Sequence, residues 1–406
     1  MTPTSRTATI VQLGIAQTLA WASSYYLPAI LAVPMARDLG VSTPTVFAAF
    51  SAALVVSALL GPAAGKAIDR HGGKPVLAAN SVIFAAGLAT LAFAQGPVGL
   101  FAGWVILGVA MSAGLYEAAF AALVHLYGKD ARGAITGITL FAGFASTVGW
   151  PLSTWLELEW GWRATCLTWA ALHLLLGLPL NWRLPASPAH AVGHVAAEAP
   201  LEVTLVETAN PAAASTANSA TRTAILLALV FAVTWFISTA MAAHLPRLLQ
   251  ANGVPLATAL IFAGLVGPAQ VAGRLLEYGL LRNIHPVISA RVAGAMHTLG
   301  AAVFLFFGVP AGALFTVLHG AGNGVLTIAK GTLPLVLFGV RDYGARQGLL
   351  MVPARFAQAT APWLFGLAID RFGAGALWFS AAMGVVAFAA LMGLKDSSRA
   401  KALQQN

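Results

Sequence analysis

The feature that most constrains this chain is a succession of apolar runs, each about twenty residues long and almost free of charge. Of its 406 residues, 59% are hydrophobic and 9% are charged. A soluble domain carries about 25% charged residues, so this chain has too few to cover a surface in water. An α-helix of about twenty residues crosses the roughly 30 Å hydrocarbon core of a bilayer. The composition therefore predicts an all-α protein embedded in a lipid bilayer.

The boundaries of these runs predict twelve transmembrane helices in two sets of six. The first set covers residues 8–36, 44–66, 75–95, 98–126, 133–157 and 162–182. The second set covers residues 222–249, 255–280, 285–308, 310–338, 344–371 and 374–394. The segment between the sets is rich in Ala, Pro, Ser and Thr and has no long apolar run. We therefore expect an N-terminal six-helix half (1–182), a cytoplasmic linker (183–221), a C-terminal six-helix half (222–394) and a cytoplasmic tail (395–406).

The basic residues predict the orientation of the helices. If both termini are cytoplasmic, sixteen of the 22 Lys and Arg residues fall on the cytoplasmic side. Only four fall on the opposite side, namely Arg37, Arg163, Arg247 and Arg371. This bias follows the positive-inside rule, and it predicts a multi-pass protein of a cell inner membrane. The net charge of +9 is spread singly between apolar runs, so we expect no nucleic-acid partner.

An internal repeat relates the two sets of helices. The fourth predicted helix ends in the letters LYGKDARG (126–133), and the tenth ends in LFGVRDYGARQG (337–348). The first helix ends near Val33-Pro34, and the seventh near Leu245-Pro246. Each helix therefore resembles the one six places later, which predicts two like halves around an axis along the membrane normal.

The loop between the second and third helices carries a motif, GKAIDRHGGK, at residues 65–74. It resembles the signature loop of the major facilitator superfamily, G-x-x-x-D-R-x-G-x-[RK]. The helix number, the repeat and the position of the loop extend this resemblance over the whole chain. In that family the loop latches the outward-facing state, which assigns a gating role to Gly65, Asp69, Arg70, Gly72 and Lys74. The alternative is a basic turn that only fixes the topology.

Two other loops echo this motif. The equivalent loop of the second half, GRLLE (273–277), keeps the glycine and an acid. A closer echo, GLAIDRFG (366–373), follows the eleventh helix on the opposite side of the membrane. We interpret this second echo as a trace of inverted three-helix repeats used in helix packing, and not as a second latch.

Three ionisable residues lie inside predicted helices, where an unpaired charge costs at least about 2.5–3.5 kcal/mol. Glu117, Lys330 and Arg355 should therefore face a polar interior. Because burial favours the protonated carboxyl, we expect Glu117 to carry the coupling proton, while Lys330 and Arg355 hold an anionic group of the substrate. The repeat places Glu117 near Lys330, so the alternative is a structural ion pair between these two.

Polar and aromatic residues at helical spacing predict the lining of a central path. Asn323, Thr327 and Lys330 share one face of their helix, as do Arg355 and Gln358. A third stripe consists of Gln17, Trp21 and Ser24, and Tyr25, Tyr26 and Tyr116 add aromatic contacts. For each residue taken singly, packing between helices is the commoner role. The predicted substrate-binding set is Trp21, Tyr25, Tyr116, Asn323, Thr327, Lys330, Arg355 and Gln358.

Other functional classes lack their residues in this sequence. There is no P-loop motif, no nucleophile–base cluster and no metal-ligand spacing, so we expect neither an enzyme nor a cofactor or metal. A single cysteine, Cys166, excludes an intrachain disulfide. The expected protein is a monomeric secondary transporter that moves a small organic solute, with a lean to an anion, by alternating access coupled to protons. Drug or amphipathic-metabolite efflux is the alternative, although the fourth helix lacks the arginine of many drug antiporters; a non-transporting sensor ranks third.

Overall fold

The computed structural model describes residues 5–185 and 211–394, and within these ranges every regular element is a helix. The N-terminal elements are α1 (Arg6–Ala22), α2 (Pro28–Asp38), α3 (Thr43–His71), α4 (Gly73–Ala92), α5 (Pro97–Gly114), α6 (Tyr116–Tyr127), η1 (Gly128–Asp130), α7 (Ala131–Ala142), α8 (Ala145–Leu172), η2 (His173–Gly177) and α9 (Leu178–Trp182). The C-terminal elements are α10 (Pro211–Ala251), α11 (Leu256–Gly264), α12 (Val266–Gly279), α13 (Pro286–Phe307), η3 (Val309–Ala311), α14 (Gly312–Phe338), α15 (Tyr343–Phe372), η4 (Gly373–Gly375) and α16 (Ala376–Gly393).

Eight segments of the described chain are long and apolar enough to cross a membrane, and some of them join several crossings. The segment Pro97–Trp182 has 86 residues and Tyr343–Gly393 has 51, whereas one crossing needs about twenty. The predicted first crossing is not among the eight segments, because it is broken into α1 and α2, of 17 and 11 residues. The joined segments and this break account for the difference from the twelve helices of the fold. Many large apolar side chains face outward, among them Val98 and Phe306, which are 83% and 79% exposed. Such a surface is suited to lipid and not to water.

The structure splits several helices that the sequence predicts as continuous. The predicted helix 8–36 is broken between α1 and α2, where Pro28 starts the second piece. The predicted helix 98–126 is broken at Leu115, whose backbone is extended, and 255–280 is interrupted at Leu265. Proline restarts a helix readily because its fixed φ suits the first turn. Apolar periodicity alone does not reveal such breaks.

One predicted boundary is wrong because of a helix that continues further. The helix predicted from residue 222 begins at Pro211, so α10 covers the end of the segment predicted as a linker. The rest of that linker, residues 186–210, and the predicted tail 395–406 lie outside the described residues.

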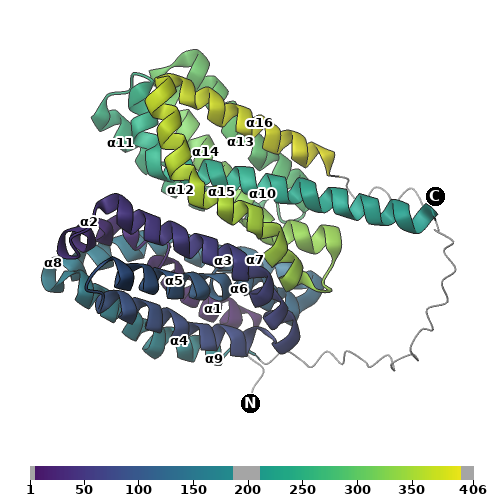
Figure 1. Cartoon of the computed structure of the whole chain (residues 1–406). Helices are drawn as coiled ribbons and strands as arrows, with labels where there is room; N and C mark the ends of the chain where they lie inside the picture. The colour runs from purple at the N-terminus through teal and green to yellow at the C-terminus, as the bar shows by residue number, and fades with distance from the viewer. Residues whose placement is uncertain (1–4, 186–210, 395–406) are drawn as a thin grey trace, which may run out of the picture.

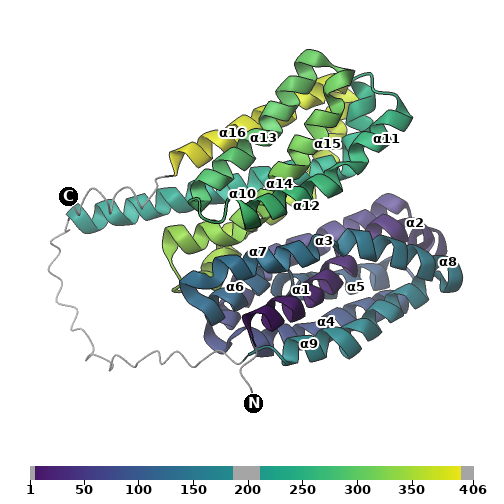
Figure 2. The same cartoon turned by 180° about the vertical axis from the view of Figure 1, so that it is seen from behind.

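Two helix bundles lie side by side, one built from α1–α9 and the other from α10–α16 (Figure 1). The same arrangement is seen from behind, where α3 and α7 of the first bundle face the second (Figure 2). Helices α3 and α15 make the most extensive contact between the two halves. We call the end that holds the α3–α4 turn the Asp69 end, and the opposite end, where α2 stops, the Asp38 end.

Candidate functional site: a latch at one end and paired charges at the centre

Asp69, at the end of α3, reaches across to the other half of the bundle. Its Oδ1 accepts a hydrogen bond of 2.9 Å from the Gly344 amide, and its Oδ2 accepts one of 2.8 Å from the Ala345 amide. Both amides belong to the first turn of α15, where helix N–H groups have no partner within the helix. The positive end of the helix dipole also favours a carboxylate there. Asp69 therefore caps a helix of the opposite half.

Four glycines allow α3 and α15 to approach this closely. Gly61 and Gly65 lie on α3, and Gly344 and Gly348 lie on α15, each pair four residues apart. A Cβ atom on Gly65 would overlap the Gly344 carbonyl, and one on Gly348 would overlap the Gly61 carbonyl. Two small-xxx-small faces meet, which is the pattern that lets transmembrane helices pack backbone to backbone.

The other residues of the motif stay within their own half. Gly72 ends α3 with φ of 80°, a conformation that favours glycine. Lys74 lies over the ring of Trp182 at 5.6 Å, and Arg70 is exposed at the Asp69 end. Of the five predicted latch residues, Gly65 and Asp69 contact the second half directly.

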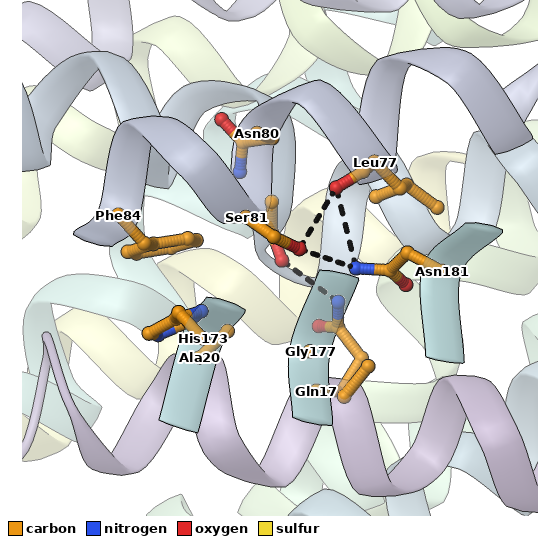
Figure 3. A pocket seen from close by; sticks show the side chains of 11 residues that line it. Gln17, Ala20, Leu77, Asn80, Ser81, Phe84, His173, Gly177 and Asn181 are labelled. Carbon is orange, nitrogen blue, oxygen red and sulfur yellow. Dashed lines mark hydrogen bonds between the residues drawn. The ribbon is translucent and has the colours of Figure 1, made fainter. Parts of the chain in front are cut away.

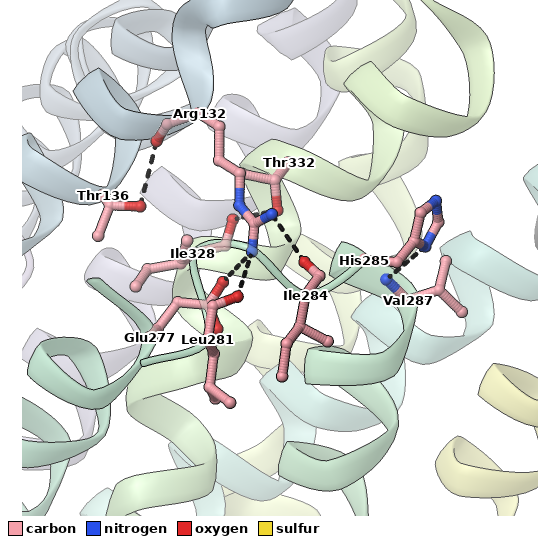
Figure 4. Close-up of polar contacts among 9 residues, drawn as sticks. All are labelled: Arg132, Thr136, Glu277, Leu281, Ile284, His285, Val287, Ile328 and Thr332. Carbon is pink, nitrogen blue, oxygen red and sulfur yellow. Dashed lines mark hydrogen bonds and ion pairs between the residues drawn. The ribbon is translucent and has the colours of Figure 1, made fainter. Parts of the chain in front are cut away.

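A second contact between the halves joins α7 to α12 (Figure 4). Arg132 Nη2 lies 2.7 Å from Glu277 Oε1, and the same guanidinium donates to the carbonyls of Leu281 and Ile284. Glu277 is 3% exposed. This acid comes from the degenerate loop at 273–277, so the second half also contributes a charged contact at the Asp69 end. The charge count alone marked Arg132 only as a topology signal.

Ion pairs at the Asp38 end do not cross between the halves. Among the described residues, Arg163 pairs with Asp38 within the first half, and Arg247 pairs with Asp370 within the second. The Asp370 contact agrees with a packing role for the echo at 366–373. The charged contacts between the halves therefore lie at the Asp69 end and at the centre of the bundle.

At the centre, Glu117 forms an ion pair with Arg355. The distance from Glu117 Oε2 to Arg355 Nη2 is 2.7 Å, and Arg355 Nη1 also donates to Gln358 Oε1 at 3.0 Å. The alternative of a structural ion pair between Glu117 and Lys330 is therefore not what the described structure contains. The repeat relates positions on α6 and α14, but it does not include the close contact of α3 with α15 that brings Arg355 up to α6.

Lys330 lies on an aromatic ring instead of a carboxylate. Its Nζ is 3.9 Å from the ring centroid of Trp235, and the Arg355 guanidinium is 5.5 Å from the same centroid. Cations are attracted to the electron-rich face of tryptophan. The Lys330 carbonyl accepts a hydrogen bond from Gln347 of α15, so the backbone at this position is tied to the helix that Asp69 caps.

Trp21 is the centre of an aromatic cluster that faces both halves. Its ring stacks near Trp235 at 6.4 Å between centroids and contacts Tyr116 at 4.8 Å and Tyr25 at 5.2 Å. The Tyr25 hydroxyl lies 3.5 Å from Thr239 Oγ1 on α10. We call Trp21, Tyr25, Tyr116 and Trp235 the aromatic cluster. Three of its four members belong to the predicted substrate-binding set.

The residues of the predicted polar stripes lie in different surroundings in the structure. On α14, the Thr327 hydroxyl donates to the Asn323 carbonyl one turn earlier, and Asn323 is half-buried. Gln17 on α1 and Ser24, just beyond the end of α1, are buried inside the first half, so the predicted central stripe reduces to Trp21. A helical spacing identifies a shared face but not the neighbour that this face meets.

Gln17 has a positioning role that the stripe did not suggest (Figure 3). Its Nε2 donates to the Gly114 carbonyl at 2.7 Å, where α5 stops. The Asn80 amide donates to the Ala110 carbonyl of the same helix at 2.9 Å. The first bond satisfies the carbonyl freed by the break at Leu115, and the new helix begins with Tyr116 and Glu117. The break therefore places both residues at the start of α6.

Sequence reasoning missed Trp235 and Arg274. Trp235 lies on the seventh predicted helix, two positions from the equivalent of Trp21 when Pro34 is aligned with Pro246. Arg274 was counted as a residue at a membrane boundary, but its side chain is 5% exposed within α12. A basic residue flanked by apolar ones can lie at a boundary or inside the bundle, and composition does not separate the two.

A helical bundle of two halves, joined at one end and carrying paired charges at its centre, is the architecture of a membrane transporter that rocks around a central site. The chain belongs to the Major Facilitator Superfamily, whose sequence profile matches residues 13–316. It is accordingly a transporter and not an enzyme.

Curated relatives match a limited part of the chain. The multidrug resistance protein MdtH of Salmonella paratyphi B is 32% identical over 133 residues, which is 31% of this chain and 31% of MdtH. Solved structures match nearly the whole chain at low identity. The human organic anion transporter MFSD10 (TETRAN) has a TM-score of 0.68 at 18% identity and covers 96% of this chain and 100% of its own. The transporter FucP, in the outward conformation, has a TM-score of 0.71 at 13% identity, with 95% and 98% covered. These structures show a shared fold.

Proposed function

We propose that this protein is a proton-coupled transporter of a small organic anion, and that Glu117 and Arg355 form its coupling pair. The observation that carries the proposal is the ion pair of 2.7 Å between α6 and α15, with side chains 15% and 4% exposed. A buried pair is costly to break by removing one charge, but protonation of the acid provides a reversible way to break it. Glu117 is the acid of this pair.

Competition for Arg355 supplies the coupling. When Glu117 is ionised, it occupies the Arg355 guanidinium. When Glu117 takes a proton, it loses most of its attraction for Arg355, which is then free to bind an anionic group of the substrate. Anion and proton therefore bind together and leave together, as symport requires. The same exchange couples the pair to the position of α15, because Arg355 and the amides bound by Asp69 lie on this one helix.

Lys330 and the aromatic cluster form the rest of the proposed substrate site. The Lys330 ammonium has the Trp235 ring as its neighbour, so an arriving carboxylate would provide the stronger partner. Trp21, Tyr25 and Tyr116 offer flat apolar surface for the carbon skeleton. Asn323, Thr327 and Gln358 complete the proposed lining.

We also propose that a latch at the Asp69 end is formed by Gly65, Asp69, Arg70, Gly72 and Lys74. We place the Asp69 end at the cytoplasmic face of a cell inner membrane, with both termini cytoplasmic, on the bias of the basic residues. In this orientation the described structure is closed towards the cytoplasm. Rocking to the other state must then break the two bonds of Asp69 and the pair between Arg132 and Glu277. We further propose that the monomer is the transporting unit.

Efflux of a drug or an amphipathic metabolite is the second candidate, because MdtH is 32% identical over its matched region. In that case the aromatic cluster would hold an apolar cation and Glu117 would be its counter-ion. Transport in reconstituted vesicles separates the two candidates. An inward proton gradient should drive accumulation of small carboxylates, and Lys330→Met and Arg355→Met should each weaken their binding. Proton-driven movement of cationic amphiphiles, with no response to carboxylates, would overturn the anion proposal.

A further inference from the structure

Arg274 is a buried charge that has no ionic partner among the described residues. Of the other buried ionisable groups near the interface between the halves, Arg355 pairs with Glu117, Glu277 pairs with Arg132, and Lys330 lies on the Trp235 ring. Arg274 is 5% exposed, and its Nε and Nη1 atoms have no hydrogen-bond partner in the protein. Isolated buried charges are strongly unfavourable, so a group of this kind needs a counter-ion.

The guanidinium lies in a space that the first half of the bundle leaves for it. Its Nη1 is packed against Gly143, at the point where α7 ends and the chain bends into α8. A Cβ atom at residue 143 would occupy the place of Nη1. Gly143 has a helical φ of −59°, so the backbone does not require glycine at this position, but the close approach of Arg274 does.

Arg274 faces the same region as the proposed substrate site. It interacts electrostatically with Tyr116 and Tyr26 of the first half and with Lys330 of the second. Tyr116 belongs to the aromatic cluster. Glu277, one turn along α12, is the nearest acid in sequence; its Oε1 is held by Arg132 and its Oε2 has no hydrogen-bond partner, but no ion pair joins it to Arg274 in the described structure. The region therefore holds three cations, Arg274, Lys330 and Arg355, and one carboxylate, Glu117.

We propose that Arg274 binds an acidic group of the transported solute, and that the substrate is a small dianion whose second acidic group lies at Lys330 and Arg355. This inference rests on the proposed function and names its substrate class. When Glu117 is protonated, as anion binding requires, the three cations have no carboxylate beside them, and a dianion offsets two of the three positive charges where a monoanion offsets one. The planar guanidinium suits a carboxylate or a phosphate group equally, because both accept paired N–H···O bonds.

The test compares matched acids on the purified full-length protein. The probes are aliphatic dicarboxylates of three to six carbons, the monomethyl ester of each, and the corresponding phosphorylated carboxylic acids. In the wild type, a diacid should bind about tenfold or more tightly than its monoester, the difference expected when a charge-assisted hydrogen-bonded pair is lost. Arg274→Gln should lower diacid binding to the level of the monoester and leave the monoester unchanged.

Two further variants keep the test independent of folding. Gly143→Ala moves the guanidinium without removing its charge, and it should also reduce the preference for diacids. Arg282→Gln, which alters an exposed arginine beyond the same helix, should bind like the wild type. The ligand-free Arg274→Gln protein should unfold at a temperature no lower than the wild type, because it loses an uncompensated buried charge. A large drop would assign Arg274 a structural role and overturn the proposal.

The outcomes separate this inference from the proposed function. If the wild type binds monoesters and diacids equally, or if Arg274→Gln keeps the preference, the dianion proposal fails while anion transport stands. If no acid of either kind binds the wild type, the anion transport proposal itself fails, and the dianion proposal fails with it. If phosphorylated acids bind and dicarboxylates do not, the dianion stands and its group at Arg274 is a phosphate.

Discussion

Arg355 Nη2 and Glu117 Oε2 lie 2.7 Å apart and join the two halves of the bundle at its centre. The pair links α6, which starts at the break after Gly114, to α15, which Asp69 caps at its first turn. One arginine thus connects the proposed proton site to the helix that closes the Asp69 end.

Glu117→Gln should abolish coupling but retain binding. The amide cannot carry the coupling proton, and it releases Arg355 permanently, so anion affinity should become independent of pH. Reconstituted protein should lose accumulation driven by a proton gradient and keep exchange of labelled for unlabelled solute. Glu159→Gln, at an exposed position on α8, is the matched control. Undiminished proton-driven accumulation by Glu117→Gln would refute the coupling role.

Asp69→Asn should weaken closure of the Asp69 end. The amide nitrogen of asparagine cannot accept the bond that Asp69 now takes from Gly344 or Ala345. The loss of a capping carboxylate is worth about 1 kcal/mol, which shifts a two-state equilibrium by roughly fivefold. Spin labels across the Asp69 end should report a larger open fraction, while substrate affinity changes less than turnover. An unchanged distance distribution would show that Asp69 is not a latch.

Gly65→Ala should also open the Asp69 end, by a steric route. The added methyl group has no space between α3 and the Gly344 carbonyl, so the two helices must separate. Gly264→Ala is a suitable control, because a Cβ atom at residue 264 meets nothing within 4 Å. Cysteines introduced at the ends of α3 and α15 should react faster with a water-soluble maleimide in Gly65→Ala than in the control. Equal rates would contradict the close-contact explanation.

The Arg132–Glu277 pair should behave as a buried ion pair. Removal of one partner from such a pair costs about 3–5 kcal/mol, because the other charge stays buried. Glu277→Gln and Arg132→Gln should each lower the thermal unfolding temperature. The loss of stability in the double variant should be smaller than the sum of the losses in the two single variants. Additive effects would mean that the residues stabilise the protein independently.

Much of the fold follows from the sequence, because hydrocarbon imposes a helix length and the positive-inside rule imposes an orientation. The GKAIDRHGGK loop indicated the family and a gating role for Asp69, which contacts the first turn of α15 in the structure. The partner of Glu117 could not be predicted, because it depends on how α15 is rotated and how closely it meets α3. Arg274 was misplaced for a related reason, since a charge near a helix end gives no sign of whether it faces headgroups or a neighbouring helix.

Asp69 binds the main chain of α15 and not a side chain. Every amino acid except proline supplies the same amide, so almost any substitution at residue 345 leaves the donor in place. The identity of this residue is therefore free to drift without loss of the contact, and a comparison of side chains would overlook it. Proline, which a first helical turn tolerates, is the single natural replacement that deletes the donor and keeps the helix. The donor at residue 345 is thus encoded by position in the helix, and at this residue only proline removes it.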